Sequence, residues 1–245
     1  MNILTKTAGM VVVGVLLAAS GAVTAQTSGQ TSGQPGATGG GGQNLASNII
    51  AARQKSAAMM VNYGWWVRTD ISKDGNNQET RIQQVAYLPN GVPQYTTISD
   101  TKAPLPRGFL RRLATKDQEK EMEKYLAGVQ QLVGQYTLPA PGAMYNFLSS
   151  ATITSGTDPM GNAILQTTGT SVVVPGDTLT VVFDAATYAI KRMDMTTSFD
   201  NHAVTMSATF RTLPSGLTHM QYATVTVPDK SLAVQIHNYD YAPND

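Results

Sequence analysis

The residues of this chain that could do chemistry are three histidines, a group of aspartates and many serines. His202, His219 and His237 are each isolated, with no second histidine or acid at the spacing of a metal-binding pair and no HExxH pattern. An isolated histidine on a strand or turn usually has a surface or structural role. The serines lie in neither a Gly-x-Ser-x-Gly turn nor a Gly-Lys-Ser/Thr loop. The sequence therefore indicates neither a hydrolase nucleophile nor a phosphate-binding loop.

Four aspartates, Asp177, Asp184, Asp194 and Asp200, cluster in the second half of the chain and could supply a pair of carboxylates. Three of them occupy predicted turns, however, where aspartate is favoured because its side chain bonds to nearby backbone groups. We therefore predict a protein that is not an enzyme and that uses no metal and no cofactor.

Methionines and large aromatic residues stand out at the positions that should face inward. Methionine is flexible and polarisable, so it suits a surface that accepts irregular apolar shapes. Two interpretations are open: these residues fill a core, or they line a cavity for an apolar ligand. The predicted cavity residues are Trp65, Met122, Tyr125, Met193, Met195, Met206 and Phe210.

Most of these predicted cavity residues lie in one stretch of the chain, from Leu179 to Leu213. Three segments with apolar residues at every second position are separated by short polar turns at 184–187 and 200–201. This alternation predicts a β-meander with one apolar face and one polar face. Similar alternation predicts the other strands, at 63–71, 81–88, 94–99, 151–154, 163–168, 171–174, 220–227 and 232–241.

Helical patterns interrupt the strands at three places. One amphipathic helix is predicted over 45–61 and a short one from Pro141 to Ser149. The strongest pattern begins at Thr115, which forms a capping box with Gln118, and continues to Tyr136. This order of elements predicts an α+β fold, with helices packed over the concave face of a curved antiparallel sheet.

A basic segment precedes the strongest helix. Lys102, Arg107, Arg111, Arg112 and Lys116 bring five positive charges and no negative charge within fifteen residues. This composition predicts a loop, with Arg107, Arg111 and Arg112 as contacts to an anionic membrane surface or to an acidic protein partner. The alternative is that the arginines pair with the acids that follow them.

The first 44 residues read as export and linker sequence. Residues 1–25 have the positive start, apolar run and small-residue cleavage site of a signal peptide, with cleavage expected before Gln26. Residues 26–44 are rich in Gly, Ser and Gln and predict a disordered linker, which leaves 45–245 as a single domain. The chain has no cysteine, so it has neither disulfides nor a lipid-anchoring cysteine, and we expect a soluble protein of the periplasm.

The charge balance limits the partners. The chain has 17 Lys and Arg against 16 Asp and Glu, and removal of the signal takes away Lys6, which leaves a neutral protein. Duplex binding needs a dominant basic surface, so this neutrality argues against nucleic acid, and we predict no nucleic-acid partner.

The meander also resembles a known family. A strand ending in Phe183-Asp184, a strand from Ile190 to Thr197 and a strand ending in Thr209-Phe210-Arg211, behind a helical pair, resemble the periplasmic lipoprotein carriers of the LolA/LolB-like superfamily. The resemblance implies a half-barrel with a helical lid over an apolar cavity that takes acyl chains. It implies a carrier of an acyl chain, a lipid or a lipoprotein, or alternatively an envelope sensor or protein-interaction module with a packed core.

Overall fold

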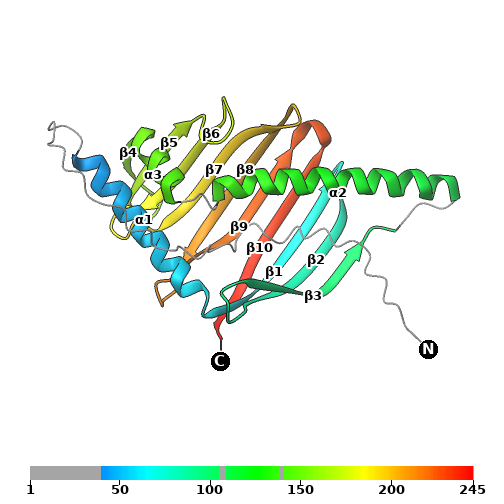
Figure 1. Cartoon of the computed structure of the whole chain (residues 1–245), viewed down its shortest axis with the longest axis horizontal. Coiled ribbons are helices and arrows are strands. Elements are labelled where there is room, and N and C mark those ends of the chain that lie inside the picture. The colour runs from blue at the N-terminus through cyan, green and yellow to red at the C-terminus, as the bar shows by residue number, and fades with distance from the viewer. Residues whose placement is uncertain (1–39, 105–108, 138–140, 245) are drawn as a thin grey trace.

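The computed structural model describes residues 40–104, 109–137 and 141–244, which form one open antiparallel sheet and three α-helices (Figure 1). The ten strands lie in the order β3-β2-β1-β10-β9-β8-β7-β6-β5-β4. The first half of the sheet consists of β1 (Tyr63–Lys73), β2 (Asn76–Tyr87), β3 (Pro93–Lys102), β9 (Thr218–Val227) and β10 (Leu232–Pro243). The second half consists of β4 (Thr152–Thr157), β5 (Ala163–Thr170), β6 (Thr178–Asp184), β7 (Ile190–Phe199) and β8 (His202–Thr212).

Helices cover one face of this sheet. α1 (Gly40–Met60) and α2 (Phe109–Thr137) cross it, and α3 (Pro141–Ser150) packs beside α1 (Figure 1). The end strands β3 and β4 do not pair with each other, so the curved sheet stays open. The predicted α+β fold, an antiparallel half-barrel with helices over one face, is confirmed.

The predicted meander is confirmed as β6, β7 and β8. Leu179, Met195, Met206 and Val225 are register partners on four successive strands, and all four are buried. Strand alternation thus places one continuous apolar row beneath the helices. The turn at Asp200-Asn201 has positive φ at both residues, as a tight hairpin between twisted strands requires.

Two helices begin earlier than predicted. α1 starts at Gly40 instead of residue 45, so residues 40–44 of the predicted linker are helical. α2 starts at Phe109, which places Thr115 inside the helix, so the predicted capping box is wrong. The residues from Phe109 to Lys116 include leucine, arginine, alanine and lysine, which are strong helix formers. The high helix propensity of these residues therefore explains why the helix includes a segment that we predicted to be a loop.

The predicted strand over 171–174 is also wrong. The backbone N–H groups of Val172, Val173 and Val174 all donate to the carboxylate of Asp177, at 2.6, 2.8 and 2.7 Å. Successive N–H groups of a strand point to opposite edges, so they cannot converge on one carboxylate. The valine-rich sequence therefore forms a loop that is folded around Asp177.

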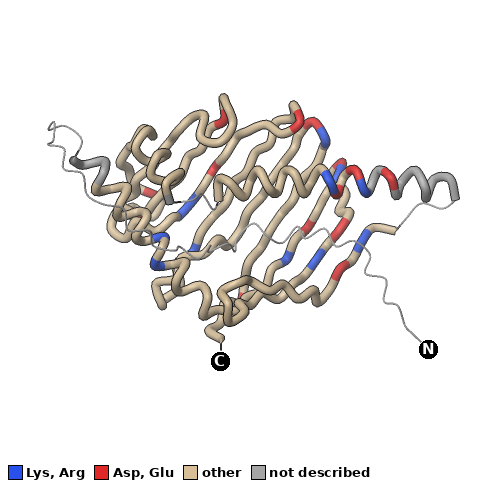
Figure 2. Tube along the Cα trace, in the orientation of Figure 1, with Lys and Arg blue, Asp and Glu red and all other residues tan. Residues whose placement is uncertain are grey.

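Charged residues are unevenly distributed along α1 and α2. Figure 2 shows acidic and basic residues on the first part of α2, whereas the second half of that helix is uncharged after Lys124. Arg53 and Lys55 give α1 its only charges between Gly40 and Met60. The apolar second half of α2 is the part that packs on the sheet, with Val129, Val133 and Tyr136 buried.

Candidate functional site

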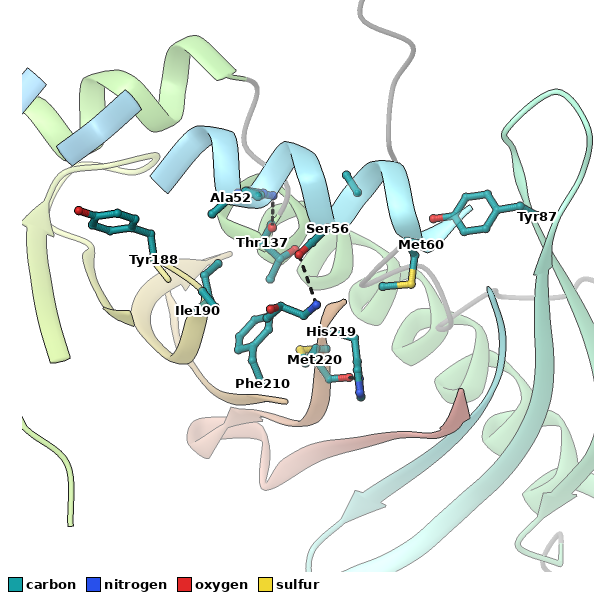
Figure 3. A pocket seen from close by; sticks show the side chains of 14 residues that line it. Ala52, Ser56, Met60, Tyr87, Thr137, Tyr188, Ile190, Phe210, His219 and Met220 are labelled. Carbon is teal, nitrogen blue, oxygen red and sulfur yellow. Dashed lines mark hydrogen bonds between the residues drawn. The ribbon is translucent and has the colours of Figure 1, made fainter. Parts of the chain in front are cut away.

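A cavity of about 110 Å³ lies between the second half of α1, the end of α2 and the sheet (Figure 3). Its apolar wall comes from distant parts of the chain: Met60, Tyr87, Tyr188, Ile190, Phe210 and Met220. Polar groups at the wall are Arg53, Ser56, Thr137, Thr218 and His219. The cavity is therefore mostly apolar, with a few polar groups, which is the usual composition of a small-molecule site.

Two hydrogen bonds hold α1 over this cavity. The Arg53 guanidinium donates from Nη2 to the carbonyl oxygen of Thr137, the last residue of α2, at 2.6 Å. The backbone N–H of Thr218 on β9 donates to Ser56 Oγ at 3.3 Å. Both bonds are drawn in Figure 3. Arg53 thus satisfies a carbonyl that the helix itself leaves free, and burial lowers the pKa of Arg53 to about 10, so it remains charged at neutral pH.

The two halves of α1 differ in their packing. The first half contains the buried residues Ala46 and Ile49, and the helix packs against α3. No side chain between Arg53 and Met60 is fully buried. The half of α1 that covers the cavity is therefore the less firmly packed half.

His219 is the buried histidine of the site. Its side chain is 4% exposed, its Nδ1 lies 3.0 Å from the carbonyl oxygen of Met220, and its ring centroid lies 3.8 Å from that of Tyr241. Its Nε2 has no hydrogen-bond partner among the described residues. Burial lowers the pKa of His219, which favours the neutral ring.

The seven predicted cavity residues do not gather around one space. Phe210 lines the cavity under α1, Met193 lines one of about 40 Å³ beside α3, and Met122 lines one of about 230 Å³ under the first part of α2. Trp65, Met195 and Met206 are each 2% exposed within the core, and none of them lines these three cavities.

Tyr125, the seventh of these residues, packs against the end of β7 and lines none of the three cavities. Its ring meets Phe199 edge-on at 5.3 Å, and the ammonium of Lys230 lies 4.6 Å from the ring centroid. Its hydroxyl is buried without a hydrogen-bond partner among the described residues.

The predicted membrane or partner contacts are only partly described. Arg107 lies outside the described residues, and Arg111 and Arg112 belong to α2, in a helix and not in the predicted loop. Lys102, at the end of β3, lies 3.6 Å from Glu79 and 3.8 Å from Glu123. This lysine of the basic segment therefore pairs with acids, whereas the pairing of the arginines stays a prediction.

Two of the four predicted aspartates, Asp177 and Asp184, accept hydrogen bonds from the backbone. Asp177 receives the three valine N–H groups and the Tyr136 hydroxyl, whose oxygen lies 2.5 Å from Oδ2. Burial acts to raise the pKa of Asp177, but the bonds from Tyr136 and the backbone outweigh it and lower the pKa. Asp184 bonds to the turn that follows it, and Asp194 pairs with Arg192. None of these contacts makes a pair of carboxylates.

Sequence reasoning missed Arg53 and Ser56 and treated His219 as structural. A signal for Arg53 existed, because it is one of two charges in an alanine-rich helix predicted to pack on the sheet. In the described part of the chain, no group of three or more His, Asp or Glu residues could hold a metal ion. No helix of that part is long and apolar enough to span a bilayer.

Comparison with known proteins gives structural likeness only. No family model and no curated protein matches the sequence. A LolA superfamily protein from Nitrosomonas europaea matches at 9% identity and TM-score 0.38, over 82% of this chain and 94% of that one. A DUF1329 family protein from Desulfovibrio piger matches at 8% identity and TM-score 0.40, over 84% and 93% of the two chains.

A third match is a domain from Vibrio parahaemolyticus described as that of an outer membrane lipoprotein-sorting protein. It has 9% identity and a TM-score of 0.37, over 81% of this chain and 93% of that one. The LolA superfamily, which the strand pattern resembles, is thus among the matches. At these identities and TM-scores the likeness does not extend to function.

Proposed function

We propose that this protein is a periplasmic, non-enzymatic carrier or binding protein for an acyl chain, a lipid or a lipoprotein. The observation that carries this proposal is the mostly apolar cavity under α1, covered by a half-helix that two hydrogen bonds hold in place. Met60, Phe210 and Met220 offer the ligand flexible or aromatic apolar surface. Burial of that surface supplies the binding energy.

The size of the cavity requires α1 to move. Sites for drug-sized ligands typically have volumes of about 300–1,000 Å³, whereas this cavity has about 110 Å³. Burial of each methylene contributes about 0.8 kcal/mol, and association costs about 4–15 kcal/mol. A chain on the order of ten methylenes is therefore needed before binding becomes favourable. Such a chain fits only if the half-helix 53–60 lifts from the sheet.

Native mass spectrometry and lipid extraction of the protein purified from its own envelope test the proposal. We expect a co-purified lipid, and uptake of a fluorescent long-chain fatty acid by the delipidated protein. Absence of both would refute the carrier function.

Spin labels test the motion of α1, since the chain has no native cysteine. Labels at the exposed positions Lys55 on α1 and Gln235 on β10 should move apart when a long-chain fatty acid binds. A control pair at Glu121 on α2 and Gln235 should keep its distance. If the ligand binds and the first pair does not move, α1 is not the lid.

A second candidate, a sensor or interaction module, is favoured by the filled core. Met195 and Met206 are each 2% exposed and line none of the three cavities, so the sheet is filled where these two residues lie. In this function the basic segment would contact an acidic partner or an anionic membrane. Reversal of the charges at Arg107, Arg111 and Arg112 would then abolish partner binding, and an unchanged pull-down would remove this candidate.

A further inference from the structure

Arg53 carries a charge that no acidic residue neutralises in the described part of the chain. Its described partners are the carbonyl oxygen of Thr137 and, at 3.8 Å, the sulfur of Met144, both of them uncharged. No carboxylate forms an ion pair with it among the described residues. The lining of the cavity also contains neither Asp nor Glu.

An unpaired, partly buried charge is costly. The C-terminus of α2 offsets part of this cost, because the aligned peptide dipoles place about half a negative charge there. A guanidinium has five N–H donors, and the two described contacts leave others free for a ligand. Arg53 therefore has both charge and hydrogen-bonding capacity that the described residues do not use.

Ser56 adds a second donor one turn further along the same helix. Its oxygen accepts the N–H of Thr218, and its own hydroxyl hydrogen has no acceptor among the described residues. Both residues line the cavity, and Figure 3 shows the Ser56 side chain on the side of α1 that faces the sheet. The two side chains thus place a cation and a hydroxyl at the edge of an otherwise apolar space.

We infer that the cavity under α1 selects amphiphiles with a single anionic head group, which Arg53 and Ser56 bind while the chain lies along Phe210 and Met220. This inference rests on the proposed function and adds the chemistry of the head. A carboxylate or a phosphate would supply the counter-charge that Arg53 lacks, through charge-assisted hydrogen bonds. The head would come either from a free fatty acid or from a phospholipid.

Three ligands with the same sixteen-carbon chain test the inference: palmitate, hexadecyl phosphate and the neutral hexadecanol. Each competes with a fluorescent hydrocarbon that has no head group, bound to the full mature protein. We expect the anionic ligands to bind roughly tenfold or more tightly than hexadecanol, as a hydrogen bond to a charged group predicts. Preference for palmitate or for hexadecyl phosphate tells which source of anion the site favours.

Variants of Arg53 distinguish an effect of its charge on ligand binding from an effect on the fold. Arg53→Gln keeps a donor for the Thr137 carbonyl without the charge, so it should remove the preference for anionic heads while circular dichroism stays unchanged. Arg53→Lys should keep part of the preference. Arg192→Met, at an exposed arginine paired with Asp194, is the matched control and should bind like the wild type.

The outcomes are distinct. Equal binding of all three ligands by the wild type, or a preference that survives Arg53→Gln, would overturn the head-group site but leave the carrier function in place. If neither the hydrocarbon nor any of the three ligands binds, the carrier function fails, and the head-group site fails with it.

Discussion

Replacement of Gly128 on α2 by alanine should loosen this helix from the sheet. A Cβ built at Gly128 would lie 2.8 Å from Cε1 of the Phe199 ring and still closer to its Cζ, so the ring or the helix must shift. Overpacking of this kind costs about 1–3 kcal/mol, and alanine regains about 1 kcal/mol through its helix propensity. We therefore expect a net loss of up to about 2 kcal/mol in the free energy of unfolding.

Gly134, in the same helix, is the matched control. A Cβ there meets no atom within 4 Å, so Gly134→Ala should raise the free energy of unfolding by up to about 1 kcal/mol. Urea unfolding followed by circular dichroism measures both variants. Phe199→Leu should cost less in the Gly128→Ala background than in the wild type, because it relieves the clash. If Gly128→Ala is as stabilising as Gly134→Ala, α2 does not lie against β7 at this distance.

Three further substitutions test the loop around Asp177, the core at Met206 and the basic segment. Asp177→Asn should cost about 2–3 kcal/mol at pH 7, since the carboxylate accepts four hydrogen bonds. Because folding lowers the pKa of Asp177, its contribution is present above the unfolded value of about 3.9 and is lost as the pH falls through the folded pKa. Urea unfolding should therefore show that the free energy of unfolding falls less between pH 7 and pH 3 for the variant than for the wild type. Met206→Ala should cost about 2–5 kcal/mol in the same assay, because the residue is fully buried. Glutamate at Arg107, Arg111 and Arg112 should leave uptake of a fluorescent fatty acid unchanged and weaken sedimentation with anionic vesicles, if the basic segment is a membrane contact.

The sequence was sufficient to predict the faces of the strands but not their neighbours. Alternation places Val67 and Val234 on the buried side, and both are buried. It could not show that β1 pairs with β10, because that pairing joins the two ends of the domain, with Ile71 opposite Val234.

The wrong strand at 171–174 has a physical cause. The loop at 171–174 was misassigned because valine is typical of strands, whereas its N–H groups bond to an aspartate that follows them in the sequence. The sequence left open whether the methionines line a cavity or fill a core, because methionine is equally suited to both. Which role it takes depends on how close the helices come, and helical periodicity does not encode that distance.

The contacts of the two helices explain why α1, and not α2, would be the lid. The Tyr136 hydroxyl lies 2.5 Å from Asp177 and 2.9 Å from Thr197, so the end of α2 is fixed to two strands through buried hydrogen bonds. Gly128 brings the middle of the same helix into close contact with Phe199. The second half of α1 has no comparable buried anchor, and Arg53 binds a neutral carbonyl that an anionic ligand can outcompete. Ligand binding at Arg53 and release of α1 would therefore be coupled through one side chain.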